Sequence, residues 1–171
     1  MIELSVVRDL VAIFGVIAGF SYYVLTVRNA QRNQRQQLET RQAQLFMQLY
    51  DRWSGVEFKQ LIREVFEMSW VDYEDFFNKY GPQSNPEAYD KIRSIGAFFE
   101  GIGVLVNRKL IEPAMVDDLM SDGIISYWER FGPIMVEVRK RWNWPQAAEW
   151  VEYLYNVIRP IVDVQHPELR K

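Results

Sequence analysis

The chain has 171 residues, a net charge of −3 and no cysteine. Its length allows one domain of ordinary size beside a short anchoring segment, and its 6 Trp, 9 Tyr and 10 Phe exclude a chain that is disordered throughout. The missing cysteines exclude disulfides, thiolate metal sites and cysteine nucleophiles.

An uncharged apolar run, LVAIFGVIAGFSYYVLTV, occupies residues 10–27. As a helix rising 1.5 Å per residue, it is just long enough for a hydrocarbon core of about 30 Å. Aromatic side chains near one end suit the membrane interface. We therefore expect residues 1–27 to contain a transmembrane anchor that spans about 10–27, with these marker residues: Leu10, Phe14, Gly15, Gly19, Tyr22, Tyr23 and Val27.

A cleaved signal peptide and a buried core helix are the two alternatives for this run. The residues before it carry no net positive charge, and the run is longer than a usual signal h-region of about 7–15 residues. No clear small-residue cleavage site follows it. The length of the run also disfavours a core helix, so we favour a retained anchor.

Residues 28–41 follow the run with four arginines against one glutamate. A basic excess directly after a span predicts an N-terminus outside and a C-terminal domain in the cytoplasm. We expect Arg28, Arg32 and Arg35 to contact lipid headgroups in the cell membrane, each contributing about 1 kcal/mol near an anionic surface. The sequence RNAQRNQRQQ holds good helix formers and one apolar residue, so this segment is predicted to be a polar helical stalk.

Apolar residues at helical spacing, separated by Gly, Pro, Asn and Asp, fill the rest of the chain. They predict a helical domain over residues 42–160 and an exposed tail over 161–171. Ser54 and Glu57 have the spacing of a capping box, and Asp72 is placed to start a short helix. A kink or interruption is expected at Gly132–Pro133, and the last helix is expected to begin near 143–145.

Asn85 and Pro86 are placed to start the most apolar predicted helix of this domain, which runs from about Pro86 to Arg108. Its Ile92, Ile95, Phe99 and Ile102 share one face, and the opposite side of the predicted helix also carries apolar residues. We expect this helix to be central. No alternating β pattern is present, so the predicted fold is all-α: one transmembrane helix that continues into the stalk, followed by a compact multi-helix cytoplasmic bundle.

Three sequence stretches carry a resemblance to a known family. FFEGIGVLVNRKLIEPAMVDDLM at residues 98–120, YWERFGPI and the later WVEYLY resemble the prokaryotic family called domain of unknown function 4760. The likeness covers most of the chain from about Gln42 to Ile158. It implies a membrane helix followed by a helical domain, and it implies no catalytic or binding residue.

Glu100 is the first candidate for chemistry, because it lies on the shoulder of the predicted central helix. Arg93 and Asn107 are each seven residues away and share its strip. A carboxyl group there requires a partner. It is either a proton-handling or ligand-binding acid with a raised pKa, or one member of a structural ion pair, and we favour the ion pair.

Other polar clusters give weaker signals. Asp117, Asp118 and Asp122 suit the start of a helix and are expected to form a solvated face rather than a metal site. His166 is the only histidine and cannot supply a metal or hydrolase constellation alone. No nucleotide-binding or zinc-protease motif is present. We therefore expect no enzyme activity, no metal and no cofactor.

Arg139 to Arg141 lie beside Trp142, Trp144 and Trp150. Such interleaving suits single-stranded nucleic acid or a membrane surface. The alternative is purely structural: Trp142 and Trp150 belong to the core, and the charged side chains of residues 139–141 are simply solvated. We favour this last interpretation and expect no nucleic-acid partner.

The sequence favours a non-enzymatic single-pass membrane protein whose cytoplasmic helical domain mediates protein–protein contact, as an accessory or scaffold subunit. The alternative is a membrane-tethered small-ligand sensor or enzyme with a pocket around Glu100. Gly15 and Gly19 have the small-xxx-small spacing of associating membrane helices. The expected partners are therefore membrane lipid and either further copies of the chain or a membrane complex.

Overall fold

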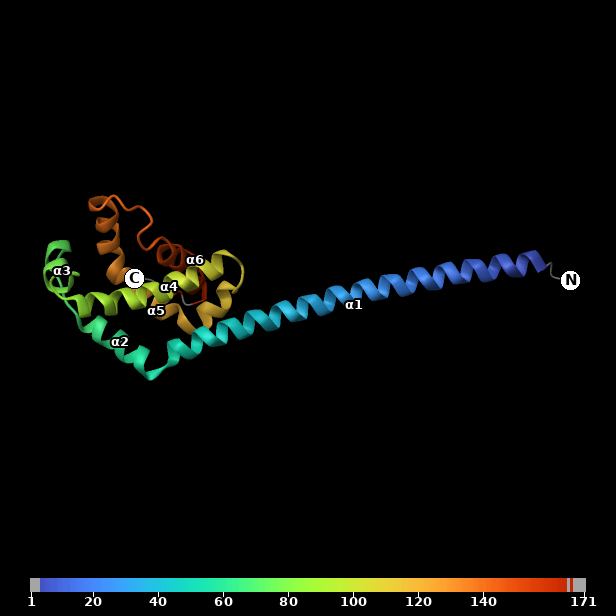
Figure 1. Cartoon of the computed structure of the whole chain (residues 1–171), viewed down its shortest axis with the longest axis horizontal. Helices are drawn as coiled ribbons and strands as arrows, with labels where there is room; N and C mark the ends of the chain where they lie inside the picture. The colour runs from blue at the N-terminus through green and yellow to red at the C-terminus, as the bar shows by residue number, and fades with distance from the viewer. Residues whose placement is uncertain (1–3, 166, 168–171) are drawn as a thin grey trace. The chain divides into compact units, whose positions relative to one another are not determined.

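The computed structural model describes residues 4–165 and 167, and over these residues it contains helices and no strand (Figure 1). This confirms the all-α prediction. The helices are α1 (Leu4–Ser54), α2 (Val56–Glu67), α3 (Tyr73–Tyr80), α4 (Pro86–Asn107), α5 (Pro113–Arg141) and α6 (Glu149–Gln165).

The chain divides into two compact units, Met1–Ala43 and Gln44–Lys171. The described part of the first unit consists of α1 alone. Among the described residues, α1 is the helix that is long enough and apolar enough to cross a membrane, judged by length and composition alone. None of its apolar stretch is buried. A helix of the soluble core would be mostly buried, so this exposure argues against that alternative.

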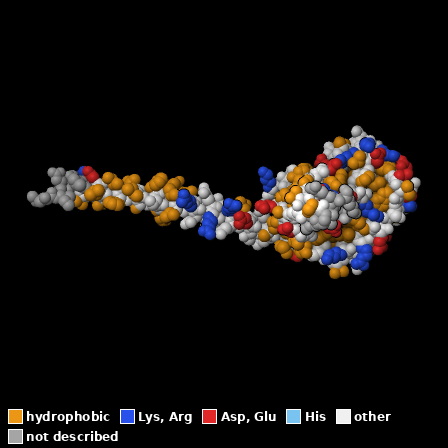
Figure 2. Space-filling view, turned by 180° about the vertical axis from the view of Figure 1, so that it is seen from behind, with side chains coloured by type: hydrophobic (Ala, Val, Ile, Leu, Met, Phe, Trp, Pro, Cys, Tyr) orange, Lys and Arg blue, Asp and Glu red, His pale blue; other side chains and the backbone are white. Residues whose placement is uncertain are grey.

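The polar stretch after the apolar run continues α1 without a break. Figure 2 shows hydrophobic side chains covering the N-terminal part of the helix, with Lys, Arg and uncharged polar side chains following them. Within this stretch the Arg35 Nε donates to a carboxylate oxygen of Glu39 at 3.1 Å. Spacing of four residues places such a pair on one helix face.

The second unit begins with the last turns of α1, where Phe46 is buried and Trp53 stacks on Phe98. The capping box expected at Ser54 is wrong. Ser54 is still helical and donates its hydroxyl to the carbonyl of Asp51 at 3.3 Å. Gly55 is the extended residue before α2 and has no side chain to cap with. Because α1 ends at Ser54 and Gly55 occupies the cap position of α2, Ser54 cannot cap α2.

The starts of α3 and α4 follow the sequence signals. The Asp72 carboxylate accepts from the backbone N–H of Asp75 at 2.9 Å. The side-chain oxygen of Asn85 accepts from the N–H of Ala88 at 3.1 Å, and Pro86 fills the first helical position. These caps satisfy N–H groups that have no partner inside a helix.

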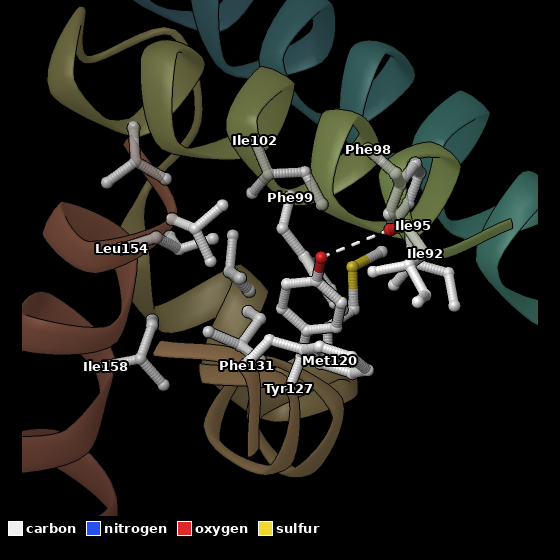
Figure 3. Close-up of a cluster of buried hydrophobic side chains, with 14 of the residues drawn as sticks. Ile92, Ile95, Phe98, Phe99, Ile102, Met120, Tyr127, Phe131, Leu154 and Ile158 are labelled. Atoms are coloured by element: carbon white, nitrogen blue, oxygen red, sulfur yellow. Dashed lines mark hydrogen bonds between the residues drawn. The ribbon is translucent and has the colours of Figure 1, made fainter. Parts of the chain in front are cut away.

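Helix α4 is central, as predicted. It packs against α2, α3 and α6, and its Ile92, Ile95, Phe99 and Ile102 are buried. Figure 3 shows these residues facing side chains from α5 and α6. The hydroxyl of Tyr127 on α5 donates to the carbonyl of Ile92 at 3.1 Å, which satisfies a buried polar group.

Helix α5 is continuous through Pro133, so of the kink or interruption that we expected there, the interruption is absent and the kink stays a prediction. A proline removes one helical hydrogen bond, but the residues on both sides of it, Gly132 and Ile134, are buried. Packing of this inner face is the physical reason that the helix continues.

Helix α6 begins at Glu149, later than the expected 143–145, because residues 142–148 form turns with left-handed φ angles at Asn143 (49°) and Ala148 (55°). It continues through Pro160 to Gln165, with Val162 buried. The prediction of an exposed tail is therefore wrong for residues 161–163, whereas Val164 and Gln165 are exposed, although they are still helical. His166 lies outside the described residues.

Candidate functional site

The helical domain contains a cavity of about 300 Å³ that is partly open to solvent. Its walls come from α3, α4, α5, the first turn of α6 and the segment 142–148, which joins α5 to α6. Most of the lining is aromatic or aliphatic. The charged side chains that line it are Arg93 and Glu100, both from α4.

One side of α4 supplies its wall of the cavity through residues three or four apart: Tyr89, Arg93, Gly96, Ala97 and Glu100. This spacing places them on one helix face. Gly96 is needed here, since a Cβ at this position would lie 2.7 Å from the hydroxyl oxygen of Tyr127. The glycine lets the buried Tyr127 ring lie against α4.

Residues 142–148 cover another side of the cavity and are held at both ends. The indole N–H of Trp142 donates to the Tyr73 hydroxyl at 3.0 Å. The Arg139 Nε donates to the carbonyl of Ala147 at 2.8 Å. Trp142 and Trp144 are 50% and 43% exposed, so their rings border both the cavity and solvent.

The Glu100 carboxyl group lies half-buried at the start of α6. Burial raises its pKa above the ordinary value, while the backbone N–H groups of Val151 and Trp150 act in the opposite direction. The nearby charges of Glu149 and Arg139 raise and lower the pKa respectively, with smaller effects. The Oε1 atom is buried and has no hydrogen-bond partner.

The structural ion pair that we favoured for Glu100 is not formed among the described residues. Arg93 is exposed, and its guanidinium carbon lies 5.9 Å from the centre of the Tyr89 ring. Asn107 is exposed at the end of α4 and does not line the cavity. The structure thus brings Glu100 and Arg93 to one cavity and leaves Asn107 outside it.

Two other expectations need correction. Asp117 is only 6% exposed, because it follows Val116 on the inner side of α5, whereas Asp118 and Asp122 are exposed as expected. Trp142 is not a core residue, because it follows the last residue of α5 and borders the cavity. Within the described residues no group of three or more His, Cys, Asp or Glu side chains could hold a metal ion.

The basic residues beside the tryptophans are engaged in ion pairs. Arg139 pairs with Glu152, Lys140 with Glu137, and Arg141 with both Glu74 and Glu137. Pairing leaves little positive charge for phosphate groups, so the electrostatic argument for a nucleic-acid or lipid surface at this place is weak.

The membrane-anchor candidates lie along the first unit of the chain. The side chains of Leu10, Phe14, Tyr22 and Tyr23 are exposed. A Cβ added at Gly15 or Gly19 would meet no atom within 4 Å. Arg28, Arg32 and Arg35 are exposed along the next turns of α1, and so is Val27 before them.

Fold and cavity together define a class: an all-α protein with a long apolar N-terminal helix and a separate helical domain that contains a mainly apolar, partly open cavity. The chain belongs to the family Domain of unknown function (DUF4760), whose model matches residues 9–158. This confirms the resemblance seen in the sequence. No curated protein and no solved structure matches the chain.

Sequence reasoning found Glu100 but missed the aromatic wall around it. The spacing of Tyr89, Arg93, Ala97 and Glu100 was a usable signal for a common face of α4. The contribution of Trp142 and Trp144 had no such signal, because their position depends on turns between α5 and α6.

Proposed function

We propose that the protein is a single-pass membrane protein that holds its helical domain at the cytoplasmic face and uses this domain for protein–protein contact. In this role it is a non-enzymatic accessory or scaffold subunit of a membrane assembly. The observation that carries the proposal is α1, whose exposed apolar segment is long enough to cross a bilayer and belongs to a unit separate from the helical domain.

The exposed arginines after the apolar segment support the orientation. Arg28, Arg32 and Arg35 follow it within the next turns of α1. Arginines in this position favour retention on the cytoplasmic side, and they can meet anionic headgroups there.

Contact between membrane helices is supported by the open surface at Gly15 and Gly19. Because an added Cβ would meet nothing there, the small-residue face is available to a second helix. A partner helix can approach closely where two small residues lie one turn apart.

Crosslinking in native membranes tests this contact. We expect wild type to give discrete adducts that the double variant Gly15→Leu/Gly19→Leu loses. Ile13→Phe/Ile17→Phe is the matched control, because it enlarges two side chains on the opposite face of the same segment and leaves the small-residue face unchanged. Unchanged adducts in the glycine variant would remove the membrane helix from the interface, and a protein without any adduct would contradict the proposed role.

A second candidate function is supported by the cavity. A membrane-tethered sensor would bind a small ligand beside Glu100, where a half-buried carboxyl group meets mainly apolar walls. Ligand pockets have this character, with few polar groups among apolar ones. A shift of several degrees in the melting temperature of the full chain with nucleotides, lipids or other small molecules would support it, because ligands that bind the folded state stabilise it.

A further inference from the structure

We propose that the cavity beside Glu100 binds an organic cation, namely a protonated or quaternary amine with a small apolar body. This inference rests on the second candidate function, since it names the ligand class of the same cavity. Three features of the lining carry it: the carboxyl group, the aromatic rings and the volume.

The Glu100 carboxyl group supplies the negative charge. It is the acidic side chain that lines the cavity, and it forms no ion pair among the described residues. An amine brought into the cavity would supply the positive charge that this carboxylate lacks, and charge-assisted hydrogen bonds are the stronger ones.

Aromatic rings supply the second element of cation recognition. Tyr89, Trp142 and Trp144 line the cavity together with Phe77, whose ring centre lies 5.7 Å from that of Trp142. A cation is attracted to the face of such rings. The chain already uses this attraction here, because the Arg93 guanidinium lies over Tyr89.

The size and polarity of the cavity select the rest of the ligand. Its volume of about 300 Å³ is at the lower end of the range for small-molecule pockets. Met135, Val138 and Val151 add aliphatic surface, which suits an apolar body. A bare divalent metal ion is a poor occupant, because Ca²⁺ and Mg²⁺ need several oxygen ligands and the lining offers one carboxylate.

Arg93 distinguishes this ligand class from the opposite one. If the cavity took an anion, Arg93 would be its partner and Glu100 would repel it. With a cation the roles are reversed, so removing the Arg93 charge should leave binding unchanged or strengthen it. The two charged residues therefore give opposite outcomes for the two classes of ligand.

Calorimetric titration of the full chain in detergent micelles tests the proposal. The probes are benzyltrimethylammonium, the neutral N,N-dimethylbenzamide of similar size, and the anion 4-phenylbutyrate. We expect saturable binding of the cation alone. Glu100→Gln should weaken it about tenfold or more, and Arg93→Gln should not weaken it. Asp90→Asn is the matched control, because Asp90 is an exposed acid of α4 outside the cavity.

A second variant keeps the test decisive if Glu100→Gln does not fold. Ala97 is exposed on the cavity wall, so Ala97→Phe should obstruct the cavity without changing its charge, and should abolish cation binding while the melting temperature stays near that of wild type. Unaltered binding in folded Glu100→Gln or in Ala97→Phe would overturn the proposal.

The remaining outcomes separate this inference from the function on which it rests. If 4-phenylbutyrate or the neutral probe binds and Ala97→Phe abolishes that binding, the cavity is a ligand site of another class, and only the cation inference fails. If none of the three probes binds, the cation inference and the small-ligand function both lose their support.

Discussion

At the residue scale, Glu100 and Gly103 join α4 to the first turn of α6. A Cβ at Gly103 would lie 2.2 Å from the carbonyl oxygen of Trp150, so the two backbones are in close approach. Glu100 lies one turn earlier on α4. The backbone N–H groups in the same turn of α6 lower the pKa of its carboxyl group, against the larger effect of burial. Ala148, before that turn, has no capping side chain, and the Glu100 carboxylate provides negative charge at the helix start.

We predict that Gly103→Ala destabilises the domain by about 1–3 kcal/mol, because the new methyl group meets backbone that cannot move aside cheaply. Gly101→Ala is the matched control on the same helix. It has open space at its Cβ position and should stabilise by up to about 1 kcal/mol, since alanine is the better helix former. Urea unfolding measures both. Equal effects of the two substitutions would contradict the close approach.

We predict that Glu100 makes the protein less stable as the pH rises. Burial raises the pKa of this carboxyl group above 4.5, so the folded state binds its proton more readily than the unfolded state does. Stability from this group is therefore lost between pH 4.5 and the raised pKa. The melting temperature of wild type relative to Glu100→Gln should fall from pH 4.5 to pH 7, and a rise would show that the N–H groups outweigh burial.

At the element scale, periodicity and caps were enough to predict the helices of the domain, and especially α4. Asp72 and Asn85 mark starts that the structure reproduces, because capping is a local interaction. Local signals failed where tertiary packing decides. Pro133 lies inside α5 because its neighbours are buried, and α6 starts late because residues 142–148 turn around the cavity.

We predict that Phe99→Ala or Ile102→Ala costs about 2–5 kcal/mol of stability, the usual range for large-to-small changes in a packed interior. Both residues are almost fully buried on α4. Val71→Ala should change the stability by less than about 0.5 kcal/mol, since Val71 is almost fully exposed. Thermal unfolding measures all three variants. Melting of either core variant together with wild type would contradict the central position of α4.

The candidate site shows the same division between local and tertiary information. Glu100 stood out in the sequence as an acid on an apolar helix. Its environment did not, because the groups around it come from distant parts of the chain: the turn residues Trp142 and Trp144, and the backbone of Trp150 and Val151. The expected ion pair failed for a related reason, since the exposed Arg93 lies over Tyr89 instead.

At the scale of the whole molecule, charge is distributed unevenly along the chain. Residues 28–41 carry four arginines against one glutamate, whereas the whole chain has a net charge of −3. In the proposed membrane assembly, arginines of neighbouring α1 helices repel one another. Salt screens such repulsion and anionic lipid neutralises it.

We therefore predict that the crosslinking yield between copies of the chain rises with ionic strength and with the fraction of anionic lipid in reconstituted vesicles. Replacing Arg28, Arg32 and Arg35 with Gln should remove both dependences while leaving the helix intact, since Gln is also a good helix former. A yield that is indifferent to salt and lipid in the wild-type protein would show that these arginines do not face each other across an interface.

In the proposed function, α1 crosses the membrane once and leaves the helical domain in the cytoplasm. Reporter fusions after Lys171 test it most directly, using one enzyme that is active only in the cytoplasm and one that is active only outside. We predict activity of the cytoplasmic reporter and none of the external one. The basic excess can be moved to the other side of the apolar segment by adding N-terminal arginines to the variant Arg28→Gln/Arg32→Gln/Arg35→Gln. In this variant the external reporter should be active and the cytoplasmic one inactive. An active external reporter on the unaltered chain would contradict the proposed orientation of α1.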